Sequence, residues 1–448
     1  MRPWKALGLA STALVAATQD IQHRGMEHAD ILALRDVPTE SRLAEQAKAE
    51  NRTLCIIRPD AQGGDDAPNI VDTFNSKCSS RSLIYMPGPT YNIQSKMITY
   101  LDDVHIVQYG RLLWSDDIDH WMSTVDLDVG FQNQTTMWYF GGVNVTWDGH
   151  NTGTLDGNGQ VWYDWAKSEG NLARRPMNIN FRALRYSIIK RMRFVQSQMW
   201  TMAITYSDHV ELRDIYVNST SNSTWSTLNT DGCDTINSHD ITFRRWFVIN
   251  GDDAIALKGN SSRIFIYDSE FHDGQGVAIG SVGQYVDRHD SVTDFYARNI
   301  TLVNTAHVSY FKSWAGVSRG YPPNGGGGGL GLATDIVMED IKVERLRQQP
   351  FFAWQCENYS GWAGKDCNSS KFKFSRIAWR RVSGTVNRDV RDLGWFQCSA
   401  AAGGCDDIEV EDIDVTYEGS DESPDGWHCE NVHGNKGFKC SGPQQESG

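Results

Sequence analysis

Apolar and polar residues alternate in short stretches that recur along most of the chain. In each copy, such as VELRDIYVNS, apolar residues alternate at first, a polar break follows, and apolar residues then resume. Alternation with a period of two predicts β-strands. The clearest copies begin at Val210, Ile241, Ile264, Phe295, Ile336 and Ile408, with a looser copy at Ile377.

The spacing of these copies predicts a solenoid. From Val210 to Phe295 their starts lie 31, 23 and 31 residues apart, and periods of 20 to 50 residues are typical of repeat architectures. No stretch between the copies is periodic enough for crossover helices, which argues against a TIM barrel or a Rossmann sheet. We therefore expect an all-β fold, a parallel β-helix whose stacked coils bury one continuous core.

Other segments complete the expected organisation. Residues 101–114 and 138–149 resemble earlier coils, and residues 18–80 are expected to form a cap. After Ser420 the chain is polar and is expected to form at most a loop closed by Cys429 and Cys440. Residues 316–331 contain five consecutive glycines, which predicts a loop. This loop is either a flexible linker or the border of a cleft.

The first residues resemble a secretory signal. Arg2 and Lys5 precede a short apolar run from Ala6 to Val15, and small residues follow it. This run is too short to cross a bilayer. We therefore expect a signal peptide over residues 1–17 and a single soluble, extracellular domain over residues 18–448, with no membrane contact.

Cysteines and glycosylation motifs fit an extracellular compartment. There are nine cysteines, and near neighbours suggest four disulfides, although sequence alone leaves the connectivity open. The suggested pairs are Cys55–Cys78, Cys356–Cys367, Cys398–Cys405 and Cys429–Cys440, with Cys233 free. Motifs for N-glycosylation occur at Asn51, Asn133, Asn144, Asn218, Asn222, Asn260, Asn299, Asn358 and Asn368. Any one of them occurs easily by chance, but together they predict a glycoprotein.

The net charge of the chain limits the kinds of partner that it can bind. The formal net charge is −14, which argues against a nucleic-acid partner. An acidic protein also repels a polyanionic substrate at long range, so recognition of an anion would need local cations. We expect a monomer, although the oligomeric state cannot be read from the sequence.

Three aspartates are the strongest candidates for chemistry. Asp252 and Asp253 are adjacent in NGDDAIALKGNS, and Asp231 lies 21 residues earlier, close to one coil of the repeat. Stacked on neighbouring coils, three carboxylates cannot all ionise cheaply, so the pKa of one must rise. Such a set can carry out acid/base hydrolysis of a glycosidic bond. Taken singly, an Asp-Asp pair is more often a turn or a calcium site.

Later coils add polar groups to the same face. Gln275 lies in GQGVAIGS, and Tyr310 and Lys312 lie in SYFKSW. With Asn229 in the turn before Asp231, they form the predicted substrate-binding set. A lone lysine is usually a solvated surface group. The assignment of Lys312 to the site therefore depends on its lying one coil after Gln275, as Gln275 lies one coil after the aspartates.

These motifs, taken in order, resemble glycoside hydrolase family 28, the polygalacturonase and rhamnogalacturonase group. They are NTD at 229–231, DD at 252–253, a Gly-x-Gly at 274–276 and Lys312, with TLDGNGQVWYDW and QSQMWT upstream. The resemblance covers roughly residues 50–415. It implies a right-handed, single-stranded parallel β-helix of the pectin-lyase-like kind, inverting hydrolysis, and no cofactor or metal. It places the general acid on Asp252 and the water-activating pair on Asp231 and Asp253.

Two departures from the family pattern bear on the substrate. Gln275 stands where the family usually has histidine, and Tyr310 stands where it usually has arginine. The acids are intact, whereas part of the machinery for consecutive galacturonates is missing. This combination resembles the exo-acting rhamnogalacturonan branch, in which a neutral rhamnose is released and Lys312 meets the next sugar, a galacturonate. The expected substrate is thus a pectic polysaccharide or oligosaccharide.

Three alternatives remain open from the sequence. An exo-polygalacturonase (galacturan 1,4-α-galacturonidase) would release galacturonic acid instead. A pectate lyase shares the β-helix but needs calcium, and a non-catalytic carbohydrate-binding β-helix would have no need of three aspartates. The released sugar, chain length and pH optimum cannot be told from the sequence.

Overall fold

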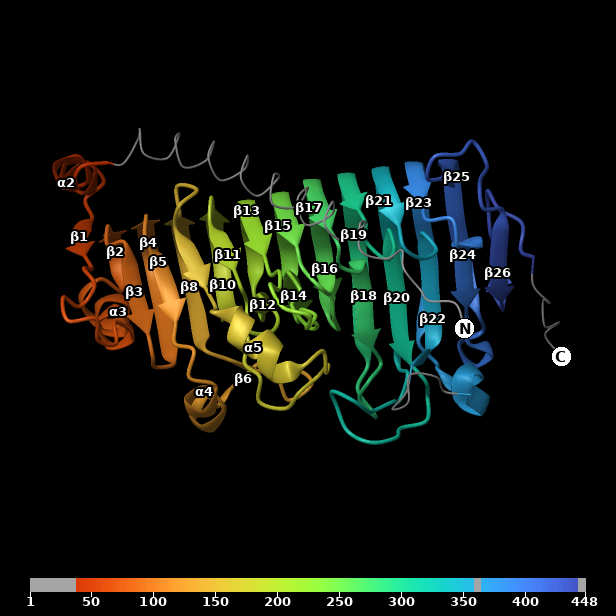
Figure 1. Ribbon diagram of the computed structural model, residues 1–448, viewed down its shortest axis with the longest axis horizontal. Helices are drawn as coiled ribbons and strands as arrows, with labels where there is room; N and C mark the ends of the chain where they lie inside the picture. The colour runs from red at the N-terminus through yellow and green to blue at the C-terminus, as the bar shows by residue number, and fades with distance from the viewer. Residues whose placement is uncertain (1–37, 358–363, 442–448) are drawn as a thin grey trace, which may run out of the picture.

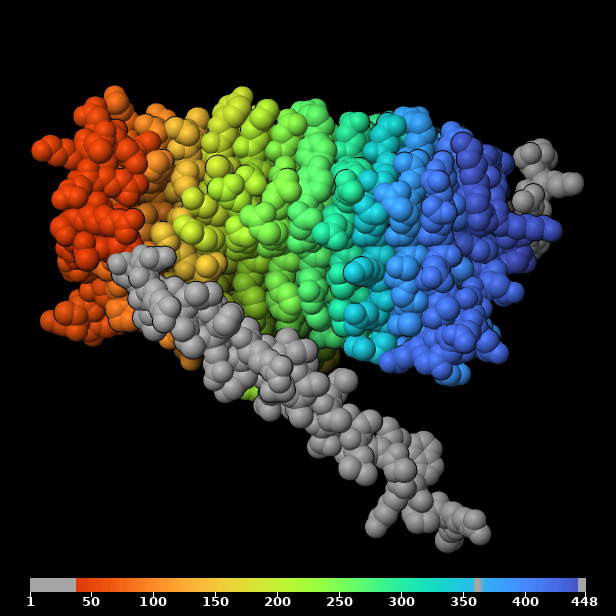
Figure 2. Space-filling view, turned by 90° about the horizontal axis from the view of Figure 1, so that it is seen from above, coloured from red at the N-terminus to blue at the C-terminus, as the bar shows by residue number. Residues whose placement is uncertain are grey.

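The computed structural model describes residues 38–357 and 364–441, and these form a long solenoid of parallel strands (Figure 1). Coils follow one another along the long axis, in bands from the red N-terminal end to the blue C-terminal end (Figure 2). The expected signal peptide lies outside the described residues. The predicted parallel β-helix is confirmed.

Most coils carry one long strand, and each long strand pairs in parallel with the next. These strands are β2 (Ser80–Met86), β4 (Met97–Gln108), β8 (Trp138–Asp148), β10 (Ile179–Lys190), β13 (Asp208–Asn218), β15 (His239–Ile249), β17 (Ser261–His272), β19 (Asp290–Val303), β21 (Gly331–Leu346), β23 (Lys373–Val386) and β25 (Cys405–Tyr417). The seven repeat copies predicted from Val210 onwards all lie within this series.

A second parallel series of short strands forms the face that carries the candidate site. It comprises β12 (Met202–Thr205), β14 (Cys233–Ile236), β16 (Asp253–Leu257), β18 (Gly276–Val282), β20 (Ser309–Trp314), β22 (Phe351–Glu357), β24 (Asp392–Gln397) and β26 (Gly426–Glu430). A third, N-terminal series comprises β3 (Thr90–Ile93), β5 (Arg111–Trp114), β9 (Thr154–Asp156) and β11 (Arg193–Val195). Apolar side chains from all three series meet in one continuous core.

The polar break in each predicted strand is a corner. Asp214, Arg245, Asp268 and Asn299 occupy equivalent positions in four successive long strands, and each has a φ between 53° and 58°. Asp and Asn tolerate this left-handed conformation better than most residues. Arg245 at such a corner lies beside Asp214 of the preceding coil, with Nε 2.5 Å from Oδ1. Each long strand therefore bends around the core without leaving its ladder.

The N-terminal cap is shorter than expected. Helix α2 (Glu40–Ala49) packs Leu43 and Ala47 against Leu83 and Tyr85 of β2. The next strand, β1 (Thr53–Ile56), already pairs in parallel with β2. Helix α3 (Ala67–Asp72) and the short η1 turn (Thr73–Lys77) follow it. The solenoid thus begins inside the region predicted to be cap.

The segment after Ser420 was expected to be polar with at most a loop, and this is wrong. Strand β26 pairs with β24, and β27 (Val432–His433) pairs with β25. Trp427 and Cys429 are the buried positions of β26. Two apolar residues in a five-residue strand are too weak a pattern to stand out in a polar sequence, but they suffice to close the end of the core.

The remaining helices and loops project at one edge of the solenoid. Helices α4 (Ile118–Thr124) and α5 (Gly159–Ala166), the antiparallel pair β6 (Leu127–Asp128) and β7 (Thr135–Thr136), and the glycine-rich loop after β20 lie at the bottom of Figure 1. Two 3-10 turns, η2 (Gly364–Ser369) and η3 (Ala400–Ala402), lie nearer the C-terminus. Within the described residues, none of the helices has the length and apolar character needed for a membrane crossing.

The glycine-rich loop is fixed to its neighbours by hydrogen bonds. The N–H groups of Gly327 and Gly329 donate to the carbonyls of Gln284 and Gly283. A Cβ on Gly327, where φ is 135°, would lie 2.5 Å from the carbonyl oxygen of Val317. The glycines therefore allow close backbone approach, and the flexible-linker interpretation does not hold for this loop.

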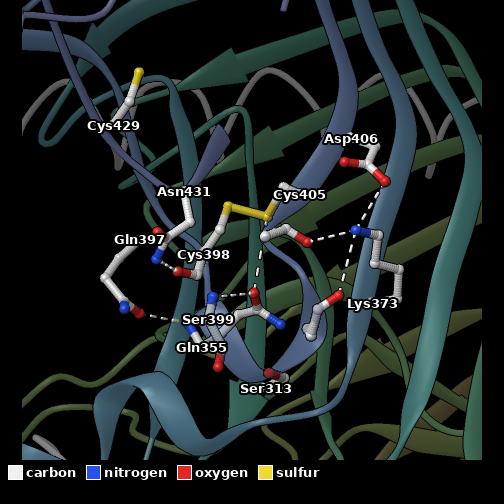
Figure 3. Close-up of a disulfide and its surroundings, with 12 residues drawn as sticks. Ser313, Gln355, Lys373, Gln397, Cys398, Ser399, Cys405, Asp406, Cys429 and Asn431 are labelled. Carbon is white, nitrogen blue, oxygen red and sulfur yellow. Dashed lines mark hydrogen bonds and ion pairs between the residues drawn. A yellow bond between two sulfur atoms is a disulfide. The ribbon is translucent and has the colours of Figure 1, made fainter. Parts of the chain in front are cut away.

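All four suggested disulfides are confirmed: Cys55–Cys78, Cys356–Cys367, Cys398–Cys405 and Cys429–Cys440. Cys233 is free and buried, as predicted. Figure 3 shows the Cys398–Cys405 bridge, which closes the η3 turn. Beside it, the Ser399 N–H donates to Gln355 Oε1 at 2.7 Å, and Lys373 Nζ lies 2.8 Å from Asp406. The first contact anchors the turn to strand β22, and the second joins β23 to β25.

Candidate active site

Successive coils bring the three predicted aspartates together. Asp231 precedes β14, Asp252 follows β15, and Asp253 begins β16. Strands β14 and β16 pair in register, and the Gly232 N–H donates to the Asp253 carbonyl at 2.9 Å. One carboxylate oxygen from each aspartate lies within 4.8 Å of the other two. The spacing of one coil therefore places them as the sequence predicts.

Hydrogen bonds orient the half-buried Asp252. Its Oδ2 accepts from the Asn229 N–H at 2.9 Å, and its Oδ1 accepts from the Asp253 N–H at 3.0 Å. Asn250 braces the same turn by donating to the Thr230 and Asp253 carbonyls. A fixed carboxyl group with one accessible side is suited to proton transfer.

Burial distinguishes the other two aspartates from Asp252. Asp231 and Asp253 are each 3% exposed. Burial raises the pKa of Asp231 well above its usual range, and the negative charges of Asp252 and Asp234 add to the effect. Burial and the Asp252 charge raise the pKa of Asp253 to about 6, against the opposing effect of Lys258 and Lys312. Both groups thus hold a proton more readily than a solvated carboxylate does.

Tyr310 lies deeper in the site than its predicted binding role implies. It is 8% exposed, and its hydroxyl donates to Asp253 Oδ1 at 2.5 Å. Its ring packs with Ala256, Ala278 and Phe352 on the outer face of the short strands. The hydroxyl is therefore committed to a carboxylate of the protein.

The remaining predicted residues lie around the acids. Gln275 is half-buried, and its N–H donates to the Asp252 carbonyl at 2.8 Å. Lys312 is half-buried, with Nζ 5.4 Å from the centre of the Tyr310 ring. The Asn229 side chain bonds to Asn171, so its main contact with the acids is the backbone N–H. All seven predicted residues thus lie at one site.

Two cavities meet at this site. One, of about 320 Å³, is lined by Asp252, Gln275, His307, Tyr310, Lys312, Gln348, Phe352, Trp354 and Glu357. The other, of about 1150 Å³, is lined mainly by hydroxyl and amide groups, many of them from residues 219–227, and it shares Gln275 with the first. Polar walls with a few aromatic rings suit a carbohydrate.

The sequence interpretation missed several of these wall residues. His307 is 5% exposed and stacks on Phe352 with ring centres 5.1 Å apart. Burial lowers its pKa to about 4, so its ring is neutral at ordinary pH. His307 precedes a short strand, as Asp231, Asp252 and Gln275 do. This shared position is the feature of the sequence that could have identified His307 as a site residue.

An apolar cluster covers the short strands β12 and β14, toward the N-terminal end of the solenoid from Lys312. Phe131, Met199 and Trp200 pack over Ala203 of β12 and Ile236 of β14, with Val129, Met177 and Tyr285 completing the cluster. Hydrogen bonds from Gln132 to Gln284, and from Gln284 to the Gly325 carbonyl, link this cover to the glycine-rich loop. The cover therefore lies over the coils of β12 and β14, which precede the coils that line the small cavity.

Closely spaced carboxylates can also bind a divalent cation, and the three aspartates are grouped tightly enough for one. Two ammonium groups, those of Lys258 and Lys312, already act on the charge of Asp253. This positive charge makes a cation unnecessary for holding the aspartates together, and we assign no metal or cofactor to the site.

Comparisons with known proteins agree with this geometry. The model of glycosyl hydrolases family 28 matches residues 122–441. The alpha-L-rhamnosidase rgxB of Aspergillus niger is 42% identical over 409 residues, covering 91% of this chain and 94% of its own. A putative galacturan 1,4-alpha-galacturonidase A of the same species is 35% identical over 396 residues, covering 83% and 90%. Among solved structures, endo-xylogalacturonan hydrolase from Aspergillus tubingensis aligns with a TM-score of 0.73 at 21% identity, covering 88% and 100%.

Proposed function

The chain belongs to glycosyl hydrolases family 28, and from this premise we propose that it releases terminal rhamnose from rhamnogalacturonan chains. It is a glycoside hydrolase of the exo-acting, pectin-degrading kind, and its fold is the right-handed parallel β-helix of its structural neighbours. Membership in a hydrolase family sets aside the lyase and binding-only alternatives. The identity of the released sugar is the proposed part.

One observation supports rhamnose as the released sugar: the small cavity has a single positively charged side chain. Among the described residues that line it, only Lys312 is positively charged, because burial keeps His307 neutral. Tyr310 adds no charge, and its hydroxyl is bonded to Asp253. One ammonium group can serve one sugar carboxylate. A chain that ends in a neutral rhamnose followed by a galacturonate needs one.

The apolar cover supports the release of a single sugar. A substrate chain that continued past the acids on the N-terminal side would meet Phe131 and Trp200, which are 1% and 3% exposed. In this proposal the wall stops the chain at its terminal sugar. An exo-acting enzyme needs this arrangement, whereas an endo-acting enzyme needs an open groove.

The proposed mechanism assigns a role to each carboxyl group. Asp252, the most accessible of the three, donates a proton to the glycosidic oxygen. Asp231 and Asp253 together orient a water molecule and take its proton as it attacks the anomeric carbon. Attack on the side opposite the leaving group inverts the anomeric configuration.

The separation of the carboxyl groups bears on inversion. Inverting glycosidases usually hold the two groups about 6.5–9.5 Å apart, and here the nearest oxygens lie within 4.8 Å. The 4.8 Å limit applies to one chosen oxygen from each group, whereas the separation in the mechanism is that of the carboxyl groups as a whole. Inversion therefore rests on the family resemblance and on the presence of two buried acids to hold water.

The proposal includes secretion and glycosylation of a monomer. The signal-like residues 1–17 support secretion, and the nine glycosylation motifs support glycosylation. The Asn144 and Asn299 side chains are exposed at the surface, whereas Asn218 is 8% exposed and donates to the Tyr216 hydroxyl. Asn218 is consequently the poorest acceptor among the described motifs.

Product analysis tests the proposal. The purified protein should release rhamnose from rhamnogalacturonan oligosaccharides with a rhamnose at the non-reducing end, with or without chelator and without a new ultraviolet-absorbing double bond. Faster release of galacturonic acid from homogalacturonan would instead establish a galacturonidase. The similarity to the putative galacturan 1,4-alpha-galacturonidase A makes that the second candidate.

A further inference from the structure

The proposed base presents an electrostatic problem. Asp231 and Asp253 must be ionised to take a proton from water, yet both are buried and lie close to a third carboxylate, Asp252. Burial and like charge both favour the protonated form. A fixed positive charge is therefore needed within a few ångströms.

Lys258 supplies that charge from inside the protein. It is 4% exposed and directly follows β16, two residues after Ala256. Its Nζ lies 3.1 Å from Asp234 Oδ1, donates to the Gly280 carbonyl at 2.7 Å, and faces the Trp200 ring at 5.2 Å. Burial alone would lower the pKa of Lys258, but the surrounding carboxylates outweigh it and raise the pKa. The Lys258 ammonium is therefore charged at every pH at which the pH dependence of the enzyme would be measured.

Asp234 competes for this ammonium. It lies on β14 and is fully buried. Apart from Lys258, neither of its carboxylate oxygens has a hydrogen-bonding partner among the described residues. Burial raises its pKa, with Lys258 opposing and Asp253 adding to the rise. Asp234 thus holds a proton more easily than a solvated aspartate, and when protonated it leaves the Lys258 charge to the other acids.

Charged and titratable groups surround Lys258 on three sides, and an apolar wall closes the fourth. Asp234 lies on β14, Asp231 in the turn before it, and Asp253 at the start of β16. On β20, Tyr310 bonds to Asp253, and Lys312 stands opposite Gly280 in register. The apolar cover closes the fourth side through Trp200. Solvent therefore screens the Lys258 charge poorly, and its field acts on the acids.

We propose that Lys258 and Asp234 are positioning residues that set the ionisation of the water-activating pair. The Lys258 ammonium keeps Asp231 and Asp253 ionised, and Asp234 determines how much of that charge they experience. Neither residue lines the small cavity at the acids, so both act through other groups. The inference rests on the proposed roles of the aspartates, but it does not depend on which sugar is released.

The test compares two variants that differ only at residue 258: Asp234→Asn and the double variant Asp234→Asn/Lys258→Met. Removing Lys258 alone would leave Asp234 buried without a partner and risks misfolding, which the double variant avoids. The readout is the pH dependence of kcat/KM on whichever pectic oligosaccharide the wild type cleaves. The acidic limb of the double variant should lie at least about one pH unit above that of Asp234→Asn, a tenfold rate difference below the limb. Asp234→Asn itself should leave the limb in place or move it to lower pH.

Controls separate this outcome from general damage. Asp290 is another fully buried carboxylate, paired with Arg288 at 3.0 Å, and Asp290→Asn should leave the limb in place. Coincident limbs for the two test variants, or an upward shift in Asp234→Asn, would overturn the inference. If Asp252→Asn and Asp231→Asn retained wild-type turnover, the proposed catalytic roles themselves would fail. Inactive aspartate variants together with coincident limbs would overturn only the role of Lys258.

Discussion

The Tyr310 hydroxyl donates a hydrogen bond to Asp253 Oδ1 at 2.5 Å, and this bond joins the predicted specificity residue to the predicted base. The bond stabilises the ionised form of Asp253 and so lowers its pKa, against the larger effect of burial. Tyr310→Phe removes the donor and keeps the ring. We expect the acidic limb of kcat/KM to move to higher pH and the rate at acidic pH to fall at least about tenfold. A higher KM with an unmoved limb would show that Tyr310 acts on substrate alone.

The substitution Tyr310→Arg tests the same position in the other direction. It should not improve rhamnose release, because the neutral terminal sugar has no carboxylate for a second cation. It should raise the weak activity on galacturonate-terminated chains. Increased rhamnose release by this variant would mean that Tyr310 does not select the sugar.

Asp252→Asn tests the general acid. Asparagine keeps the shape but cannot donate the proton, and loss of acid assistance costs about 10²–10⁴-fold in rate. Turnover should fall by that factor with little change in substrate binding by calorimetry. The exposed Asp421 offers a matched control, since Asp421→Asn removes one carboxylate far from the acids in the chain and should retain full activity. Wild-type turnover in Asp252→Asn would refute the assignment.

The sequence predicted the long strands well, because each alternates between core and solvent. Strand β13 buries Val210, Leu212, Ile215 and Val217, whereas the residues between them are only half-buried. The short strands carry no such signal. All five residues of β16 are buried, since one face of the strand meets the core and the other meets the site. Only the acids at the start of this strand marked it.

The cavity walls could not be read from the sequence for a different reason. Phe352 and Trp354 line the same cavity as Tyr310 and Lys312, yet they follow 42 residues later because the glycine-rich loop and strand β21 intervene. Such insertions break the regular spacing that linked the aspartates. Asp234 and Lys258 escaped notice as a pair because their contact runs across strands rather than along the chain.

Inversion is tested by the configuration of the first-formed sugar. Proton NMR of the reaction in progress should show the inverted anomer of rhamnose before mutarotation mixes the two forms. The water held by Asp231 and Asp253 attacks directly, so no covalent sugar–enzyme species forms. A retained configuration would mean that one carboxylate acts as a nucleophile.

The apolar cover should control product size. Phe131→Ala removes a buried ring from the cover and should allow some release of products longer than one sugar, which chromatography would detect. The loss of a buried phenylalanine costs about 3–5 kcal/mol, so the control must be destabilised as well. Phe74 is equally buried but lies in the main core near the N-terminal end, and Phe74→Ala should still release single sugars only. Unchanged products from Phe131→Ala would show that something else limits the cut to the chain end.

Lys312 provides the most direct test of the substrate. Its side chain lines the small cavity with Trp354 and Glu357. Burial raises the pKa of Glu357, with Lys312 opposing. A lysine in contact with a sugar carboxylate contributes about 1.5–3 kcal/mol through a charge-assisted hydrogen bond.

Lys312→Ala should therefore lower kcat/KM about 10- to 150-fold on oligosaccharides in which galacturonate follows the terminal rhamnose. At a pH above the acidic limb, where Asp253 stays ionised without the Lys312 charge, a synthetic rhamnoside without that acid should be cleaved almost as fast as by the wild type. Its leaving group carries no charge for the ammonium to bind. Lys342→Ala, which removes an exposed lysine from β21, controls for the change in net charge. If Lys312→Ala slowed both substrates equally, Lys312 would act on the catalytic acids rather than on the second sugar. A native enzyme that released galacturonic acid faster than rhamnose would place the galacturonate carboxylate at the terminal sugar and make the galacturonidase the correct assignment.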